Sequence, residues 1–128
     1  MRLRLTSIDE FQFLTCLKNE IWGSKTNRFK EWREGDYLVI IVNKSIAGIG
    51  EIMGKSFKSD TPVWDNGLFP YRISVKFIHA MHKNNRPPVL GKLRDVITSA
   101  FGYNYGLGIL NQVLIESDYA KIIYEEIT

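Results

Sequence analysis

Residues 37–42 read Tyr-Leu-Val-Ile-Ile-Val, and Asn43-Lys44 separate them from a second apolar run at residues 46–53. The first run is continuous and rich in β-branched residues, which is typical of a strand buried on both faces. Asn43-Lys44 predicts a turn, so residues 46–53 return as a second strand. This second strand carries Gly48 and Gly50, and glycines within a strand often mark a bulge or the close approach of another backbone.

The segment before this hairpin predicts a strand and a helix. Residues 2–6 alternate polar and apolar side chains, which favours a short strand. Ser7 and Glu10 have the spacing of a capping box, so a helix is expected over residues 8–19, with Phe11, Leu14 and Leu17 facing inward. Residues 21–24 then predict a loop, and residues 28–32 a single helical turn.

The segment after the hairpin continues the mixed pattern. Residues 57–68 predict a polar loop, residues 71–78 a third long strand, and residues 89–99 a helix after Pro87-Pro88. Residues 101–108 are compatible with a loop or a strand, and helical spacing returns from Ser117 to the end. Together these elements indicate one α+β domain over residues 1–128, built around a curved or barrel-like sheet.

Composition supports a folded globular chain. The 128 residues are 45% hydrophobic and 24% charged, which is ordinary for a single domain and unlike a disordered chain. No apolar run approaches the roughly 20 residues that a membrane-spanning helix needs, and no signal peptide is evident, so we expect no membrane partner. The single cysteine, Cys16, cannot form an internal disulfide, which favours a cytoplasmic location.

The charge is unevenly distributed. The net charge is only +3, but residues 55–94 carry eight Lys or Arg against two acids, whereas residues 95–128 carry one Lys against five acids. A surface polarised in this way suits a polyanion such as nucleic acid. The alternative is that the basic run is an ordinary solvated face.

Catalytic chemistry finds little support in the sequence. Gly54-Lys55-Ser56 resembles the end of a phosphate-binding loop, but the glycine required five positions before Gly54 is replaced by Ile49. His79 and His82 point to opposite faces of a strand and have no metal-ligating neighbour, so two surface histidines are the better interpretation. Cys16 lies in an apolar helix and is expected to behave as a small hydrophobic side chain. We therefore expect no catalytic residue, no metal site and no cofactor.

Two tryptophans stand out. Trp22 precedes a glycine and Trp64 precedes Asp-Asn-Gly, so both fall in segments predicted to be loops. Large aromatic side chains in loops are costly to expose unless they stack on a ligand, and extruded bases are held between such walls. The alternative is that each tryptophan folds back to plug the core. Trp32 is expected to pack against the sheet.

Taken in order, these features resemble the EVE domain, a PUA-like fold related to the YTH domain. The resemblance covers nearly the whole chain and rests on Trp22-Gly23, Gly35-Asp36, residues 47–52, Trp64 and Pro70-Tyr71-Arg72-Ile73, followed by the final helix. It implies a small β-barrel of about five or six strands flanked by helices, with a pocket at one mouth. In YTH relatives the pocket is an aromatic cage around a methylated adenine. The chain lacks the tryptophan that many such domains have in the first strand, since Leu3, Arg4 and Leu5 stand there.

The resemblance also implies a function. EVE-like domains occur as specificity modules of McrB-type, modification-dependent restriction systems, where a methylated base of DNA is flipped out. The chain is therefore expected to be a non-catalytic module that recognises a modified base, with DNA favoured over RNA. It could be free-standing, or it could work with a fused or associated nucleotide-hydrolysing motor domain. The alternatives are an RNA-binding EVE module and a small-ligand or protein-interaction domain.

The expected site residues follow from the same resemblance and from the charge pattern. The pocket is expected to use the two tryptophans as walls and short polar residues as contacts to the base edge, and nearby cations are expected to contact phosphates. The pocket residues are Trp22, Trp64, Thr6, Ser7, Gly23, Ser24 and Asn27. The phosphate-binding residues are Lys25, Arg28, Lys55, Lys58, Arg72 and Arg86.

Overall fold

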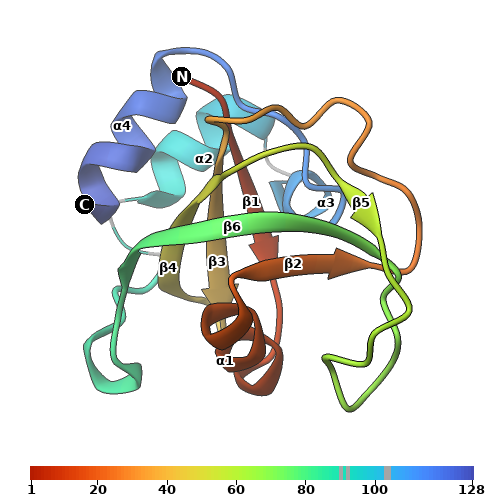
Figure 1. The fold of residues 1–128 in the computed structure, drawn as a ribbon. Helices are drawn as coiled ribbons and strands as arrows, with labels where there is room; N and C mark the ends of the chain where they lie inside the picture. The colour runs from red at the N-terminus through yellow and green to blue at the C-terminus, as the bar shows by residue number, and fades with distance from the viewer. Residues whose placement is uncertain (90, 92, 103–104) are drawn as a thin grey trace.

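The computed structural model describes residues 1–89, 91, 93–102 and 105–128. These residues form a mixed sheet covered by helices (Figure 1). The strands are β1 (Leu3–Ser7), β2 (Ile21–Ser24), β3 (Tyr37–Val42), β4 (Ser45–Ile52), β5 (Phe57–Lys58) and β6 (Tyr71–Ala80). The helices are α1 (Glu10–Asn19), the short 3₁₀ helix η1 (Lys83–Asn85), α2 (Leu93–Phe101), α3 (Tyr105–Leu110) and α4 (Asp118–Ile127).

The sheet curls because one long strand joins its two halves. Its order is β1-β3-β4-β6-β2, with β5 also paired to β6. The first residues of β6 pair with β2 and β5, whereas its later residues pair with β4. In Figure 1, β6 and β2 therefore cross in front of β1 and β3, and the sheet closes into a half-barrel. This architecture confirms the predicted α+β fold with a curved sheet of five or six strands.

The central hairpin was predicted correctly. Alternate residues of β3 point into two separate cores: Val39 and Ile41 pack with helices α2 and α4, whereas Leu38, Ile40 and Val42 pack with α1. Burial on both faces is therefore confirmed. The connecting Asn43 and Lys44 both have positive φ, of 49° and 63°. That backbone matches the type I′ turn that joins two twisted strands closely.

The glycines of β4 are required by close approach of β6, as expected. The β4–β6 register shifts between Ile49 and Gly50. A Cβ on Gly50 would overlap Val75 Cγ1, and one on Gly48 would lie 2.9 Å from the His79 carbonyl oxygen. A larger residue at Gly48 would push the backbone of β6 away, and one at Gly50 would displace the Val75 side chain.

The first helix begins later than predicted. Asp9, not Ser7, is the N-cap: its side chain accepts a hydrogen bond from the amide of Gln12, whereas Ser7 ends β1. The buried side chains are accordingly Phe13 and Cys16, and the predicted inward position Phe11 is 84% exposed. The prediction was wrong because an alternative cap two residues downstream starts the helix and a different stripe faces the sheet.

Five further segments differ from the prediction. Residues 21–24 form a strand, because they pair with β6 about 50 residues downstream, which no local pattern reveals. Residues 28–32 contain a turn but no helix, and the predicted loop over residues 57–68 opens with the short strand β5. Residues 105–110 form helix α3, although a loop or strand was predicted for residues 101–108, and residues 103 and 104 of that prediction lie outside the described residues. Of the helix predicted over residues 89–99, residues 93–99 lie in α2, and residues 90 and 92 lie outside the described residues.

A buried ion cluster connects the start of β3 to β1. Both oxygens of the Asp36 carboxylate are used: Oδ2 accepts from Arg4 Nη1 at 2.7 Å and Oδ1 from Arg2 Nε at 2.8 Å. Burial alone raises the pKa of the Asp36 carboxyl, but hydrogen bonds from the Arg33 amide and from the two guanidinium groups outweigh it and lower that pKa. The ionised carboxylate is therefore part of the folded state.

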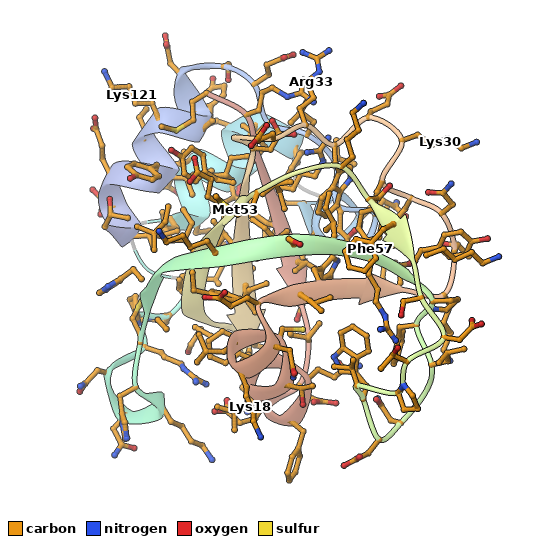
Figure 2. All side chains as sticks on the ribbon, in the orientation of Figure 1. Lys18, Lys30, Arg33, Met53, Phe57 and Lys121 are labelled. Carbon is orange, nitrogen blue, oxygen red and sulfur yellow. The ribbon has the colours of Figure 1, made fainter. Side chains whose placement is uncertain are left out.

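Among the described residues, Arg72 is the other buried charged side chain, and most of the remaining ones are exposed. The labelled Lys18, Lys30, Arg33 and Lys121 in Figure 2 are all exposed. Within the described part of the chain, none of the helices has the length and apolar character to cross a membrane.

Candidate nucleic-acid interface

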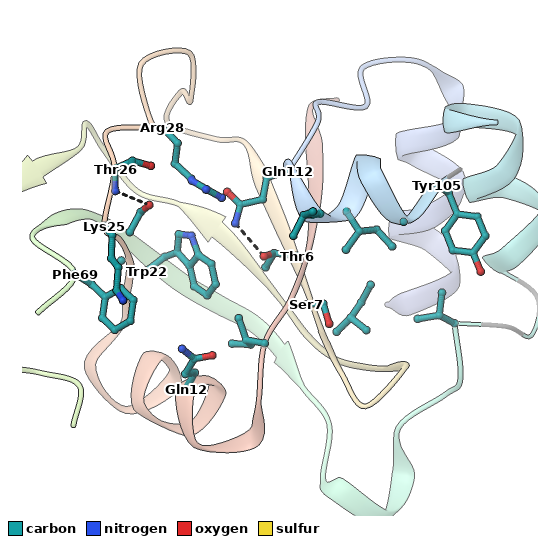
Figure 3. A pocket seen from close by; sticks show the side chains of 18 of the residues that line it. Thr6, Ser7, Gln12, Trp22, Lys25, Thr26, Arg28, Phe69, Tyr105 and Gln112 are labelled. Carbon is teal, nitrogen blue, oxygen red and sulfur yellow. Dashed lines mark hydrogen bonds between the residues drawn. The ribbon is translucent and has the colours of Figure 1, made fainter. Parts of the chain in front are cut away.

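A large pocket opens beside the end of β1. Its volume is about 900 Å³, near the upper end of the roughly 300–1,000 Å³ usual for ligand sites. Figure 3 shows the segment after β2 on one side, Thr6 and Ser7 in the middle, and Tyr105 of α3 on the other side. The described residues that line it are Thr6, Ser7, Ile8, Gln12, Trp22, Gly23, Ser24, Lys25, Thr26, Arg28, Ile41, Lys44, Phe69, Val89, Tyr105, Gly106, Ile109, Leu110 and Gln112.

The structure brings together most of the pocket residues expected from the sequence, together with two of the expected phosphate contacts. Those that line this pocket are Thr6, Ser7, Trp22, Gly23, Ser24, Lys25 and Arg28. Asn27 is exposed and does not line it, although its neighbours Thr26 and Arg28 do. The end of β1 and the end of β2 converge here because both strands belong to the same curled sheet.

Trp22 contributes an aromatic wall from a strand. Alternation along β2 buries Trp22 and Ser24, and Trp22 is only 7% exposed. Its ring lines the pocket, and its indole Nε1 is buried without a hydrogen-bond partner. In Figure 3 this nitrogen lies at the edge of the ring that faces Arg28 and Gln112.

Trp64 is not among the residues that line this pocket, but it lines a small cavity of about 20 Å³ that shares Trp22, Gly23 and Phe69 with it. It is 8% exposed and packs so closely on Gly23 that an added Cβ there would lie 2.5 Å from the indole. The ring meets Phe69 edge-on at 5.3 Å between centroids. Phe69 lines the pocket on the same side as Trp22, and Trp64 packs against it. Phe69 lies in the Phe-Pro-Tyr motif, but the sequence does not show which of the two rings turns inward.

Arg72 is held inside the protein. It is 2% exposed, and its guanidinium donates to the carbonyls of Phe69, Leu68 and Thr61 while lying 5.3 Å from the Trp64 ring centroid. These bonds order the loop that carries Phe69. The structure therefore does not place Arg72 for the predicted contact with phosphate.

Arg86 is also engaged within the chain. Its nearly buried side chain forms an ion pair with Glu10 through both Nη atoms and donates from Nε to the Met81 carbonyl at 3.1 Å. The hydrogen bond from Arg86 lowers the pKa of the Glu10 carboxyl. The structure thus gives Arg86 the role of joining α1 to the segment after β6, not a phosphate-facing role.

The remaining predicted cations are exposed. Lys25 and Arg28 lie at the rim of the pocket, with Lys25 Nζ 5.5 Å from the Phe69 ring centroid. Lys44, which the sequence did not single out, also lines the pocket, whereas Lys55 and Lys58 are exposed away from it. No Asp or Glu is among the described lining residues, so the charged side chains at this pocket are all basic.

Gln112 is a pocket residue that the sequence did not reveal. Its Nε2 donates to Thr6 Oγ1 at 2.9 Å, across 106 positions of the chain. Its Oε1 is buried without a partner. No local pattern marks a glutamine beyond the end of a short helix as a pocket residue.

Cys16 was expected in the core and the two histidines at the surface, and both placements are confirmed, although His82 lies beyond the end of β6 and not on the strand. Cys16 is buried in the core, and burial raises the pKa of its thiol to about 11. His79 and His82 are exposed. Within residues 1–89, 91, 93–102 and 105–128, no three His, Cys, Asp or Glu side chains come together as metal ligands would.

The chain has the fold of the YTH domains, within the PUA-like architecture. It superposes on the "YTH domain-containing protein mmi1 and RNA complex" with a TM-score of 0.72 and 12% identity, over 98% of this chain and 80% of that one. The Zygosaccharomyces rouxii MRB1 YTH domain in complex with N6-methyladenosine RNA gives 0.60 and 16%, over 97% and 86%. The Pho92 YTH domain in complex with m6A gives 0.63 and 14%, over 98% and 82%. No family model matches the chain, and no curated protein matches it in sequence.

Proposed function

We propose that this protein is a non-catalytic nucleic-acid-binding module that recognises a modified base, with methylated adenine in RNA as the first candidate. The observation that carries the proposal is the pocket itself, in which Trp22 and Phe69 face a cavity rimmed by Lys25 and Arg28. Structures of the same fold have been described with RNA, and with N6-methyladenosine RNA in particular.

Binding energy would come from two sources. Stacking of an extruded base on an aromatic ring contributes about 1–3 kcal/mol, and a methyl group in an apolar niche adds about 1 kcal/mol. Lys25 and Arg28 would contact the flanking phosphates, which makes affinity depend on salt. The methyl increment corresponds to about a fivefold preference, so recognition also requires polar contacts to the base edge.

RNA replaces DNA as the favoured partner. The sequence-based expectation of DNA came from the resemblance to EVE modules of McrB-type restriction systems. That finer assignment has no support among the structures of the same fold, three of which are described in complex with RNA or m6A. Association with a motor domain and a cytoplasmic location stay predictions.

The test is a fluorescence-polarisation panel at two salt concentrations. Single-stranded RNA of one sequence would carry adenosine, N6-methyladenosine, cytidine or 5-methylcytidine at one position, alongside matching single- and double-stranded DNA. We expect the tightest binding to one methylated RNA, weakened about 5- to 150-fold in Trp22→Leu because stacking is removed. Trp32→Leu is the matched control, since Trp32 is half-buried and does not line the pocket.

Other outcomes discriminate the alternatives. Tightest binding to a methylated DNA would instead favour the role of a DNA specificity module of a McrB-type restriction system. Binding that ignores both methylation and Trp22 would contradict a base-reading pocket. Absence of binding to every oligonucleotide would favour a small-ligand or protein-interaction domain.

A further inference from the structure

Two polar atoms at the pocket are buried and lack a partner. They are Gln112 Oε1, an acceptor, and Trp22 Nε1, a donor, and no other unpaired buried side-chain polar atom was found in the described part of the chain. Buried polar groups are almost always hydrogen-bonded, because losing water without a replacement is costly. Both residues line the same cavity, so a ligand bound there would lie next to both side chains.

Gln112 is held in place by its surroundings. The residue is 8% exposed, its backbone amide donates to the Ile109 carbonyl at 3.2 Å, and its Nε2 donates to Thr6 Oγ1. Its φ of 52° lies in the left-handed region, where glycine or asparagine is the usual residue after a helix. A glutamine in this backbone conformation places its amide at the pocket, where Figure 3 shows it beside Thr6.

We propose that Gln112 Oε1 accepts a hydrogen bond from the exocyclic amine of the bound base, so that the pocket selects amino bases over keto bases. This inference rests on the proposed function and specifies the chemistry of that site. Adenine and cytosine carry an exocyclic amine, and an N6-monomethylated adenine still has one N–H to donate. A keto base presents an oxygen at the equivalent position, which would leave two acceptors facing each other and Oε1 still unpaired.

Thr6 is the positioning residue in this arrangement. Its hydroxyl accepts from Gln112 Nε2, and because Nε2 is engaged there, Oε1 is the atom left free for the ligand. Thr6 is itself buried in β1, so the hydroxyl is fixed by the sheet. Thr6→Val keeps the shape of the side chain and removes this acceptor.

The experiment compares bases that differ at the amine. RNA of one sequence would carry adenosine, inosine, N6-methyladenosine or N6,N6-dimethyladenosine at the recognised position, because inosine has a keto group and the dimethylated base has no N–H. For the wild type we expect adenosine to bind about 5- to 150-fold more tightly than inosine, the range that corresponds to burying an unpaired polar group. The monomethylated base should likewise bind more tightly than the dimethylated one.

Variants then assign the effect to the amide oxygen. Gln112→Met keeps the length of the side chain and removes the acceptor, so both preferences should fall to near unity. Gln112→Glu keeps an acceptor, so this variant should still bind adenosine more tightly than inosine. Thr6→Val should reduce the preference partially. Circular dichroism and thermal unfolding establish that each variant is folded, and the ratio between two ligands on the same variant does not depend on the fraction folded.

The outcomes separate this inference from the function on which it rests. If Gln112→Met discriminates adenosine from inosine as the wild type does, while methylated RNA still binds selectively, the role of Gln112 is refuted and the function stands. A wild type that binds inosine as tightly as adenosine refutes it in the same way. If no oligonucleotide binds, both are refuted.

Discussion

Phe69 and Trp64 offer the sharpest test of how the pocket is built, because the structure gives them different tasks. Phe69 faces the cavity, contacts Trp64 edge-on at 5.3 Å and lies under Lys25 Nζ at 5.5 Å. Removing the ring in Phe69→Ala costs about 0.5–1.5 kcal/mol from the aromatic pair and about 0.5–1 kcal/mol from the cation–π interaction. The expected decrease in stability is therefore about 1–2.5 kcal/mol in total, and the fold should survive, since domains of this kind have roughly 5–15 kcal/mol.

The same variant should weaken binding more visibly than folding. If Phe69 stacks on the base, its removal costs about 1–3 kcal/mol of binding free energy, or about 5- to 150-fold in Kd. Trp64→Ala should instead lower the stability more than the affinity. It empties a buried site that contacts Gly23 and Arg72, so it should cost about 3–5 kcal/mol of stability. Trp64→Phe is a milder version with a smaller cavity.

Two assays on each variant distinguish these tasks. Thermal or urea unfolding gives the stability, and fluorescence polarisation well below the unfolding transition gives the affinity for the preferred oligonucleotide. Wild-type affinity in Phe69→Ala would show that Phe69 is not a wall of the pocket. Loss of binding in Trp64→Phe with unchanged stability would show that Trp64, not Phe69, meets the ligand.

Three further predictions concern charge and the thiol. Neutralising Lys25 or Arg28 to Gln should lower the slope of log Kd against log salt by about 0.7 for each phosphate that the side chain would have neutralised, whereas Lys18→Gln on the outer face of α1 should leave it unchanged. Asp36→Asn should cost about 3–5 kcal/mol of stability, because it leaves buried guanidinium charge uncompensated. Because the folded-state pKa of Asp36 is lowered, the stability that its carboxylate contributes is complete above the unfolded-state pKa of ~4 and disappears as the pH falls through the folded-state pKa. The free energies of unfolding of wild type and variant should therefore converge in acid. Native Cys16, with a thiol pKa of about 11, should react with a thiol reagent far more slowly than the unfolded chain does, and equal rates would contradict its burial.

Much of the fold could be predicted from local pattern. Residues 37–42 alternate between two cores, and a continuous β-branched run can be buried on both faces only as an inner strand. Gly48 and Gly50 predicted a bulge or the close approach of another backbone: the backbone of β6 lies close to Gly48, and the register shifts at Gly50. The start of α1 was misplaced because two nearby polar residues could each cap it, and local sequence does not choose between them.

The candidate site was predicted only in part, because the features that the sequence did not reveal depend on contacts between residues far apart in the chain. Trp22 and Thr6 were expected at the pocket and lie there, but β2 was invisible because its partner β6 is distant in sequence. Whether Trp64 or Phe69 faces the cavity depends on Gly23, since only a glycine at this position of β2 lets the Trp64 ring pack against it.

The sequence by itself therefore determined four of the strands, the central turn, the excess of basic residues and the aromatic residues available for a pocket, since these depend on periodicity and residue type. Only the tertiary structure decided which cations are free: Arg72 and Arg86 have the same charge as Arg28, but their guanidinium groups are used by carbonyls and by Glu10 within the fold. The pairing of Gln112 with Thr6 likewise exists only because the sheet and the segment after α3 bring two distant positions within hydrogen-bond distance. Hydrogen bonds and burial depend on distance in space, and sequence separation does not encode that distance.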